Sequence, residues 1–262
     1  MRLSHPGKGF RMHAFKDKVA LVTGSTGEGL GRSIAFTLAR EGAKVVLNYG
    51  TGHPNNSLAA DKVLSELRAL GGKGYAFKAD TREEDEVSDM IDGIISLYGR
   101  LDFLICNAGG AWTAEDITAV DQEHWRSVIK AEVDGLFYCV KHALPHMRNA
   151  RYGRIVAISK AGADEQSGPP YDYLLGKGAR NRFIRSLAKT EILMGVTCNI
   201  VAPGHTRRLT LKEAADAAKH GTLWRRRRSA MTQDAAEAVR FLCSDVASFI
   251  TGSVIEVAGN TE

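Results

Sequence analysis

The stretch that decides the fold is VALVTGSTGEGLG, residues 19–31. Its first four residues are apolar, and Thr23 and Gly24 follow them, a pattern that predicts a short buried strand entering a tight turn. The helix-like run from Ile34 to Glu41 comes next, and Gly42 is a typical stop signal for it. We therefore predict a strand, a glycine-rich turn and a helix in direct succession.

The same alternation of short apolar runs and longer helix-like runs continues almost to the end of the chain. Further strands are expected at 45–47, 75–77, 101–106, 154–159, 196–201 and 254–257. Further helices are expected at 57–70, 83–97, 124–147, 173–193 and 235–243, with a polar stretch at 205–228. Strands separated by crossover helices predict an α/β fold, a doubly wound parallel sheet of about seven strands with helices on both faces. We expect one domain at 18–262, preceded by a flexible lead-in at 1–17.

The composition is that of an ordinary globular protein. The 262 residues include 35 Lys and Arg against 30 Asp and Glu, so 35 − 30 leaves a net charge of +5, with 44% hydrophobic and 25% charged residues. These values exclude a disordered chain, a collagen and a coiled coil. A mild basic excess without a basic patch is weak evidence for nucleic-acid binding. No apolar run reaches the ~18 residues of a membrane helix, and the N-terminus lacks the apolar core of a secretory signal, so a cytoplasmic location is expected.

The cysteines suggest no special chemistry. Cys106, Cys139, Cys198 and Cys243 are far apart, with no CxxC pair and no clustered histidines. They are expected to be free thiols in an intracellular core, and we predict neither a metal site nor a disulfide framework.

The glycine-rich turn is typical of a dinucleotide-binding fingerprint, because it lies between a predicted strand and a predicted helix. Glycines allow the backbone to approach a pyrophosphate, and the helix N-terminus offers free N–H groups and a partial positive charge. The predicted cofactor-binding residues in this turn are Gly24, Ser25, Thr26, Gly29, Leu30 and Gly31.

The end of the second strand bears on the choice of cofactor. An acidic residue that would hold the adenosine ribose belongs there, but the sequence reads Leu47-Asn48-Tyr49-Gly50-Thr51. Because no carboxylate would repel a 2′-phosphate, Asn48 and Tyr49 favour NADP(H) over NAD(H). Glu28 in the glycine-rich turn works against this preference, and a plain turn also explains residues 48–52.

With these residues in view, the chain resembles the short-chain dehydrogenase/reductase family from Lys18 to Asn260. The motifs that carry the likeness are the glycine-rich turn, Asp80-Thr81, Asn107-Ala108-Gly109, Tyr173-xxx-Lys177, Asn199 to Gly204 and Ile250-Thr251-Gly252. The resemblance implies a Rossmann fold and a nicotinamide cofactor. It implies adenine contacts from Asp80 and Thr81, cofactor contacts from Asn107, Ala108 and Gly109, and nicotinamide contacts from Pro203, Gly204 and Thr206. Residues 57–73 are also similar to members that process acyl-CoA, although a helix surface explains them as well.

Tyr173 and Lys177 are the predicted catalytic pair. They are four residues apart on one helix and therefore share a face, where an ammonium would stabilise the phenolate and lower the pKa of the tyrosine. Such a tyrosine can give a proton to a developing alkoxide while the nicotinamide carries the hydride. In the family the lysine also holds the nicotinamide ribose. Tyr171 is the nearest competitor, but Leu175 occupies the position of its partner.

Three positions depart from the family pattern. The glycine-rich turn has four residues between Gly24 and Gly29, one more than usual in the family. Lys160 occupies the position of the usual catalytic serine, with Ser159 beside it, and Glu132 occupies that of the usual asparagine. Local drift at surface positions explains both replacements. Alternatively, a Lys160 ammonium polarises the substrate oxygen, and Glu132 pairs with Lys160 or Lys177 or relays protons through water.

The substrate side is less specific. Candidate contacts are Trp112, Lys160, Asp164 and His205, each also explained as ordinary loop or core structure. Residues 205–230 occupy the place of the family's substrate lid and contain Arg207, Arg208 and the run Arg225 to Arg228. These arginines favour an anionic substrate or contact with the cofactor phosphates, or they form a solvated basic face.

These motifs predict an NADP(H)-dependent oxidoreductase that transfers a hydride to or from a ketone, an imine or a related polar double bond. The alternative is a biosynthetic enzyme of the same family whose main activity is cyclisation, dehydration or isomerisation. A non-catalytic nucleotide-binding regulator is a third reading, which the retention of both Tyr173 and Lys177 opposes. The resemblance also implies a homo-oligomer, a dimer or tetramer, that binds neither nucleic acid nor membrane.

Overall fold

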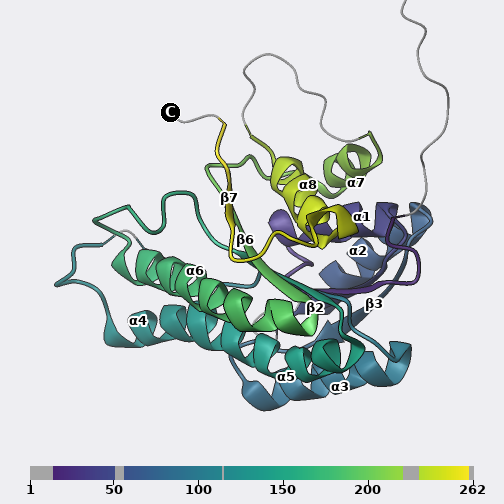
Figure 1. The fold of residues 1–262 in the computed structure, drawn as a ribbon. Coiled ribbons are helices and arrows are strands. Elements are labelled where there is room, and N and C mark those ends of the chain that lie inside the picture. The colour runs from purple at the N-terminus through teal and green to yellow at the C-terminus, as the bar shows by residue number, and fades with distance from the viewer. Residues whose placement is uncertain (1–13, 51–55, 114, 221–229, 260–262) are drawn as a thin grey trace, which may run out of the picture.

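The computed structural model describes residues 14–50, 56–113, 115–220 and 230–259. In this part of the chain, parallel strands form one seven-stranded sheet in the order β3-β2-β1-β4-β5-β6-β7 (Figure 1). The strands are β1 (Val19–Val22), β2 (Lys44–Tyr49), β3 (Lys73–Lys78), β4 (Phe103–Cys106), β5 (Gly153–Ile158), β6 (Val196–Pro203) and β7 (Val254–Val257). The predicted doubly wound α/β fold is confirmed.

Helices cover both faces of this sheet. They are α1 (Leu30–Arg40), α2 (Asn56–Ala69), α3 (Glu84–Tyr98), α4 (Gln122–Ile129), α5 (Gly135–Ala150), α6 (Tyr171–Glu191), α7 (Leu211–His220) and α8 (Thr232–Cys243). Helices α1, α2, α7 and α8 lie on one face, and α3, α5 and α6 lie on the other (Figure 1). Only the ends of the strands are therefore open to a ligand.

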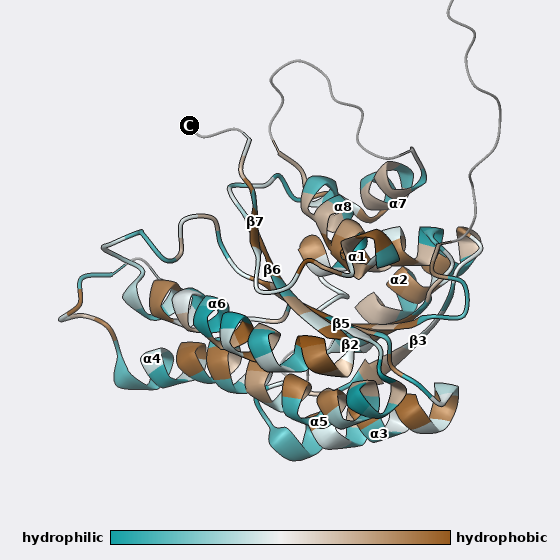
Figure 2. Cartoon of the chain, in the orientation of Figure 1, coloured by the Kyte–Doolittle hydropathy of each residue, from teal (hydrophilic) through white to brown (hydrophobic). Residues whose placement is uncertain are grey.

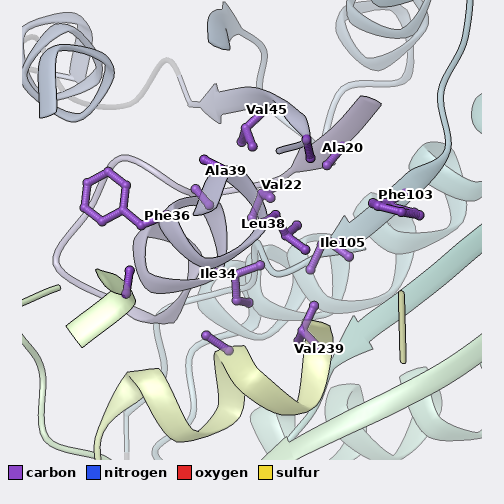
Figure 3. Packing of buried hydrophobic residues seen from close by; sticks show 14 of the residues in the cluster. Ala20, Val22, Ile34, Phe36, Leu38, Ala39, Val45, Phe103, Ile105 and Val239 are labelled. Carbon is purple, nitrogen blue, oxygen red and sulfur yellow. The ribbon is translucent and has the colours of Figure 1, made fainter. Parts of the chain in front are cut away.

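Each strand contributes to two hydrophobic cores, because successive side chains of a strand point to opposite faces. In β5, Val156 and Ile158 belong to one core, and Ile155 and Ala157 belong to the other. Figure 2 shows the hydrophobic colouring of the strands between the two layers of helices. In the core under α1, Ile34 packs in one cluster with sheet residues and with helix α8 (Figure 3).

The helix expected at 124–147 differs from the prediction in one respect that matters for the site. A π-helical turn, Lys130–Asp134, separates α4 from α5. In a π turn the backbone hydrogen bonds run from residue i to i+5, so the side chains after it are rotated relative to an uninterrupted α-helix. The apolar spacing of the sequence does not reveal such a turn.

The expectation of a polar stretch at 205–228 misses helix α7. Ala214, Ala215 and Ala218 give this helix a small apolar face, which is buried. Residues 221–229 of the expected lid and residues 1–13 of the expected lead-in lie outside the described residues.

The four cysteines are buried free thiols, as predicted. Within the described ranges, no helix combines the length and the apolar character that crossing a bilayer requires.

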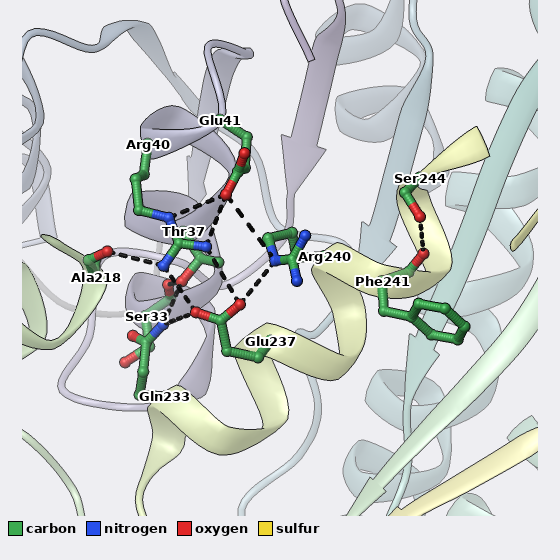
Figure 4. A network of polar contacts seen from close by, with 10 residues as sticks. All are labelled: Ser33, Thr37, Arg40, Glu41, Ala218, Gln233, Glu237, Arg240, Phe241 and Ser244. Atoms are coloured by element: carbon green, nitrogen blue, oxygen red, sulfur yellow. Dashed lines mark hydrogen bonds and ion pairs between the residues drawn. The ribbon is translucent and has the colours of Figure 1, made fainter. Parts of the chain in front are cut away.

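A network of ion pairs fastens α1, the helix after the glycine-rich turn, to α8 (Figure 4). Glu237 of α8 accepts hydrogen bonds from Arg40 of α1 at 2.8 Å and from Arg240 at 2.7 Å. Arg40 also donates to the carbonyl of Ala218 in α7 at 2.9 Å. Burial raises the pKa of Glu237, but the hydrogen bonds from Arg40 and Arg240 outweigh this effect and leave the pKa below its usual value.

Replacing Glu237 by Gln is expected to lower the free energy of unfolding near neutral pH by about 1 kcal/mol, because the two arginines lose a charged acceptor that is partly screened by solvent. The folded-state pKa of Glu237 lies below the unfolded value of 4.5, so its contribution is complete above that value and is lost as the pH falls through the folded-state pKa. The gap between parent and variant in urea unfolding should therefore shrink in acid.

The matched control is Glu213→Gln, which breaks an exposed ion pair with Arg207. We expect it to change stability by less than about 0.5 kcal/mol. Equal losses in the two variants would show that the α1–α8 network is no stronger than a surface pair.

Candidate active site

The candidate site lies at the carboxyl edge of the sheet, where the strand order reverses. The chain moves from β1 outward through β2 to β3 and then places β4 on the other side of β1. In parallel α/β sheets, such a switch point leaves a crevice in which ligands bind. The segments that follow β1, β2, β3 and β4 meet here around a hollow of about 320 Å³.

The hollow brings together many of the predicted cofactor residues. It is lined by Gly24, Asn48, Asp80, Thr81, Asn107, Ala108 and Gly109, all predicted, and by Gly50, Ala79, Arg82 and Ala131, which were not. Gly50 and Arg82 directly follow predicted residues, so proximity in the sequence was the available signal for them. The remaining predicted residues of the glycine-rich turn lead from Gly24 into helix α1.

The glycine-rich turn has the backbone features of a phosphate site. Gly24 has a φ of 60°, which disfavours any side chain. At Gly31 a Cβ would lie 2.5 Å from Asn107 Nδ2 and 2.6 Å from the carbonyl oxygen of Gly24. Among the described residues, no side chain caps α1 at Gly29 and no acidic residue lies in its first turn. The first N–H groups of α1 are therefore available for phosphate oxygens.

Asn48 and the pair of Asp80 and Arg82 are polar groups in the lining of the hollow. Asn48 is buried, accepts a hydrogen bond from the N–H of Gly24 at 3.1 Å and donates to the carbonyl of Ala79 at 2.9 Å. Arg82 folds onto Asp80, with 2.6 Å from its NH2 to Oδ2, and this contact lowers the pKa of Asp80. Asn48 thus holds the turn in place, while Asp80 and Arg82 neutralise each other.

Tyr173 and Lys177 lie one turn apart on α6, as predicted. Lys177 Nζ is 5.2 Å from the centroid of the Tyr173 ring. The ring of Trp112 lies 5.6 Å from the same ring, between centroids, and Trp112 is 49% exposed. Trp112, predicted to lie on the substrate side, is therefore a half-exposed neighbour of the Tyr173 ring.

Burial sets the protonation of this pair. It raises the pKa of Tyr173 to about 12, with Glu132 adding to the rise and Arg180 opposing it. Burial also lowers the pKa of Lys177 to about 8, with Arg180 adding to the fall and Glu132 opposing it. The expectation of a lowered tyrosine pKa is thus wrong for this structure, because burial of the phenol is the dominant effect. Tyr173 is a neutral phenol, and so a proton donor, at neutral pH.

Glu132 lies at the centre of the charged groups. Its carboxylate is fully buried, and Oε2 accepts hydrogen bonds from Lys177 Nζ at 2.9 Å and from Arg180 NH1 at 3.0 Å. Oε1 accepts from the N–H of Gly110 at 3.1 Å. Of the two sequence-based pairings for Glu132, the structure therefore contains the one with Lys177.

Arg180 is the residue that the sequence reasoning missed. It lies three residues after Lys177 on α6, so the i,i+3 spacing from a predicted catalytic lysine was a usable signal. The spacing does not reveal that the side chain of Arg180 is buried, with only 1% of the residue exposed.

Ser159 and Lys160 do not share a direction. The hydroxyl of Ser159 is buried and donates to the carbonyl of Lys177 at 3.3 Å. The ammonium of Lys160 donates to Gln166 Oε1 and, at 3.3 Å, to the carbonyl of Ala161. Burial lowers the pKa of Lys160, and nearby Glu256 opposes that effect.

The other predicted substrate residues lie around this edge. Asp164 binds Asn181 and Arg185 of α6 at 2.9 and 3.0 Å, which ties the loop before α6 to that helix. His205 is exposed on the segment that carries Pro203, Gly204 and Thr206. Arg207 pairs with Glu213 at 3.1 Å, and the arginines at 225–228 lie outside the described residues.

Known proteins resemble this chain along nearly its whole length. Residues 24–259 match the family model described as enoyl-(acyl carrier protein) reductase. A short chain dehydrogenase/reductase of Cryptosporiopsis sp. (strain 8999) is 34% identical over 259 residues, 92% of this chain and 94% of that protein. Cis-4-hydroxycyclohexanecarboxylate dehydrogenase of Sinomonas cyclohexanicum is 35% identical over 250 residues, 94% and 97% of the two chains. A 3-oxoacyl-(acyl-carrier-protein) reductase of Staphylococcus aureus (strain Mu50) is 34% identical over 245 residues, 92% and 97% of the two chains.

The matched residues include the whole sheet from β2 onward, the hollow at its switch point and the pair of Tyr173 and Lys177. Fold and similarity together show that this chain belongs to the short-chain dehydrogenase/reductase family and is an oxidoreductase.

Proposed function

We propose that the protein reduces a ketone or imine by hydride transfer from NADPH, with Tyr173 as the proton donor. The observation that carries this proposal is the neutral phenol of Tyr173 beside the buried ion pair of Lys177 and Glu132, at the sheet edge that holds the hollow. A phenol that stays protonated at neutral pH suits reduction, because the product oxygen or nitrogen must gain a proton.

The residues around the hollow fit a dinucleotide. The N–H groups at the start of α1 would bind the pyrophosphate, and Asp80, Thr81 and Asn107 to Gly109 would surround the adenosine half. Lys177 would hold the nicotinamide ribose, with Pro203, Gly204 and Thr206 beside the nicotinamide. The bound nicotinamide would supply the hydride. Because the described lining contains no carboxylate other than Asp80, which Arg82 neutralises, a 2′-phosphate meets no unpaired negative charge there.

Tyr173 would donate its Oη proton to the substrate oxygen of a ketone or the substrate nitrogen of an imine, which gives the alcohol or the amine. Lys177, held by Glu132, would stabilise the phenolate that remains. Lys160 would polarise the substrate oxygen after leaving Gln166, since the Ser159 hydroxyl is already bonded to the backbone of α6.

The names of the relatives support a carbonyl or alcohol substrate that carries an acidic or acyl group. One is a dehydrogenase of a hydroxycyclohexanecarboxylate, and another is a reductase of 3-oxoacyl groups on a carrier protein. Of the ketones and imines proposed above, these names therefore favour a ketone that carries an acidic or acyl group. Neither name favours cyclisation, dehydration or isomerisation as the main activity.

The central test is Tyr173→Phe, which removes only the donating hydroxyl. We expect kcat to fall by roughly a hundredfold or more, the usual contribution of a general acid, with NADPH affinity nearly unchanged. NADPH consumption against a panel of ketones, imines and enones measures the first, and NADPH fluorescence the second. Tyr171→Phe, two residues earlier on α6, is the matched control and should keep its activity. Undiminished turnover in Tyr173→Phe would remove Tyr173 from the mechanism.

Lys160→Ala tests the polarising group. We expect kcat to fall at least about tenfold, as when a donor to a developing oxyanion is lost, while NADPH still binds. Gln166→Ala is its control, because it releases the Lys160 ammonium without removing it, and should keep the rate. An unaltered rate in Lys160→Ala would leave no role for this lysine in the reaction.

Gly50→Asp tests the cofactor preference. Gly50 lines the hollow, has no positive φ, and a Cβ added there would meet nothing within 4 Å, so an aspartate fits. Its carboxylate should repel a 2′-phosphate and reduce the ratio of kcat/KM for NADPH to that for NADH about tenfold, the equivalent of one close like-charge contact screened by solvent. Gly50→Asn, of equal size without charge, should leave the ratio near the parent value. Equal ratios in both variants would refute an NADPH preference set at this edge.

A further inference from the structure

Arg180 is the largest of the fully buried side chains in the described part of the chain, and burying its charge needs a reason. An unpaired charge in a protein interior costs several kcal/mol, so buried arginines are found with partners. Here NH1 donates to Glu132 Oε2 and to the carbonyl of Ala108, both at 3.0 Å, and to the carbonyl of Glu132 at 3.2 Å, while NH2 donates to the carbonyl of Cys106. The guanidinium is carried on α6 and is thus hydrogen-bonded both to the end of β4 with the segment after it and to the π turn.

The charges around Tyr173 can be counted from these contacts. Glu132 contributes one negative charge, and Lys177 and Arg180 contribute one positive charge each. Asp172, the residue before Tyr173, is a separate buried carboxylate that faces His124 of α4 at 3.4 Å and accepts the N–H of Tyr173 at 2.7 Å, while Ser159 and Ile158 supply only uncharged oxygens. The cluster of Glu132, Lys177 and Arg180 therefore carries a net charge of +1, and the sum with the phenol falls to zero when Tyr173 has lost its proton.

Without Arg180, the carboxylate of Glu132 would cancel the charge of Lys177. We propose that Arg180 is a positioning residue that compensates Glu132, so that the cluster beside Tyr173 stays positive and can stabilise a phenolate. This inference rests on the proposed function only in assigning that phenolate a part in catalysis. Arg180 acts through Glu132 and Lys177, not by touching the substrate.

The backbone around Glu132 supports a site built for this carboxylate. A Cβ at Gly109 would lie 2.4 Å from Glu132 Oε1, and a Cβ at Gly176 would lie 2.7 Å from Glu132 Cβ. Glycine at both positions leaves room for the glutamate, and the π turn that contains Glu132 is of a kind frequent at functional sites. Glu132 and Arg180 thus form one ion-paired unit.

The same guanidinium also joins the cofactor hollow to the reaction centre. The carbonyls of Cys106 and Ala108 flank Asn107, and Asn107 and Ala108 line the hollow. Arg180 therefore connects the backbone that lines the hollow to the helix that carries Tyr173 and Lys177.

The experiment is a double-mutant cycle of Arg180→Met and Glu132→Gln in the full chain. Arg180→Met should lower the plateau of kcat roughly tenfold, for a transition state that loses one favourable charge. It should also move the loss of activity in alkali to higher pH, because Lys177 keeps its proton longer without a neighbouring cation. Glu132→Gln should move that loss to lower pH, since two cations are left side by side. The double variant has a net charge of +1, as the parent has, so its kcat should lie near the parent value and well above that of Arg180→Met alone.

A readout that needs no turnover is the titration of Lys177 by NMR of labelled lysine side chains, with the signal assigned by its absence in Lys177→Met. The midpoint should lie near the pKa of about 8 in the parent, higher in Arg180→Met and lower in Glu132→Gln. If the midpoints move in this way in a protein that reduces no carbonyl, the compensation stands and the proposed function falls. If the midpoints are equal in parent and Arg180→Met, or the two changes simply multiply in kcat, the compensation is refuted.

Arg154→Met is the matched control. Arg154 is another buried arginine, 4% exposed, paired with Asp245 at 3.1 Å rather than with the site. It should lower the melting temperature without moving the titration of Lys177. Should Arg180→Met fail to fold, Arg180→Lys keeps the charge and must leave the midpoint near the parent value. The double variant, again with a net charge of +1, should then keep a kcat near that of the parent.

Discussion

A parallel sheet buried on both faces leaves only the ends of its strands for chemistry, and this constraint organises the rest of the structure. The two layers of helices occupy the faces, so the polar groups that bind or react must lie on the segments leaving the strands. The reversal of strand order between β1 and β4 opens those segments into a hollow. Helix α1 starts at this edge. Its last residue, Arg40, donates hydrogen bonds to the backbone of α7 and to Glu237 of α8.

The second organising feature is the buried carboxylate of Glu132. It accepts hydrogen bonds from Lys177 and Arg180 of α6 and from the backbone N–H of Gly110. One side chain therefore connects α6, the π turn and the segment after β4. Two cations and one anion in the interior are costly unless each is paired, and here each has at least one partner. The arrangement sets a neutral phenol against a positive cluster, which is the electrostatic basis of the proposed proton transfer.

The sequence predicted the fold because strands, turns and helices are local features that follow from apolar spacing and from glycine. Of the residues around the hollow, Gly24 and Asn48 were expected from the ends of predicted strands, whereas Asp80 and Asn107 were expected only from the resemblance to the family. The sequence did not predict the π turn, helix α7 or the raised pKa of Tyr173, because each depends on packing or burial. Asp164 illustrates the same limit, since a residue placed on the substrate side by its position binds Asn181 and Arg185.

By itself, then, the sequence determined a doubly wound domain, the glycine-rich turn and the pair of Tyr173 and Lys177 on one helical face, since each is encoded by spacing along a few residues. Only the tertiary structure decided what surrounds that pair. Glu132 lies 48 residues before Arg180 in the sequence, and the contact, burial and net charge of Glu132, Lys177 and Arg180 exist only when the π turn packs against α6. The direction of Lys160, away from Ser159 and onto Gln166, was likewise decided by the loop that folds over the end of β5.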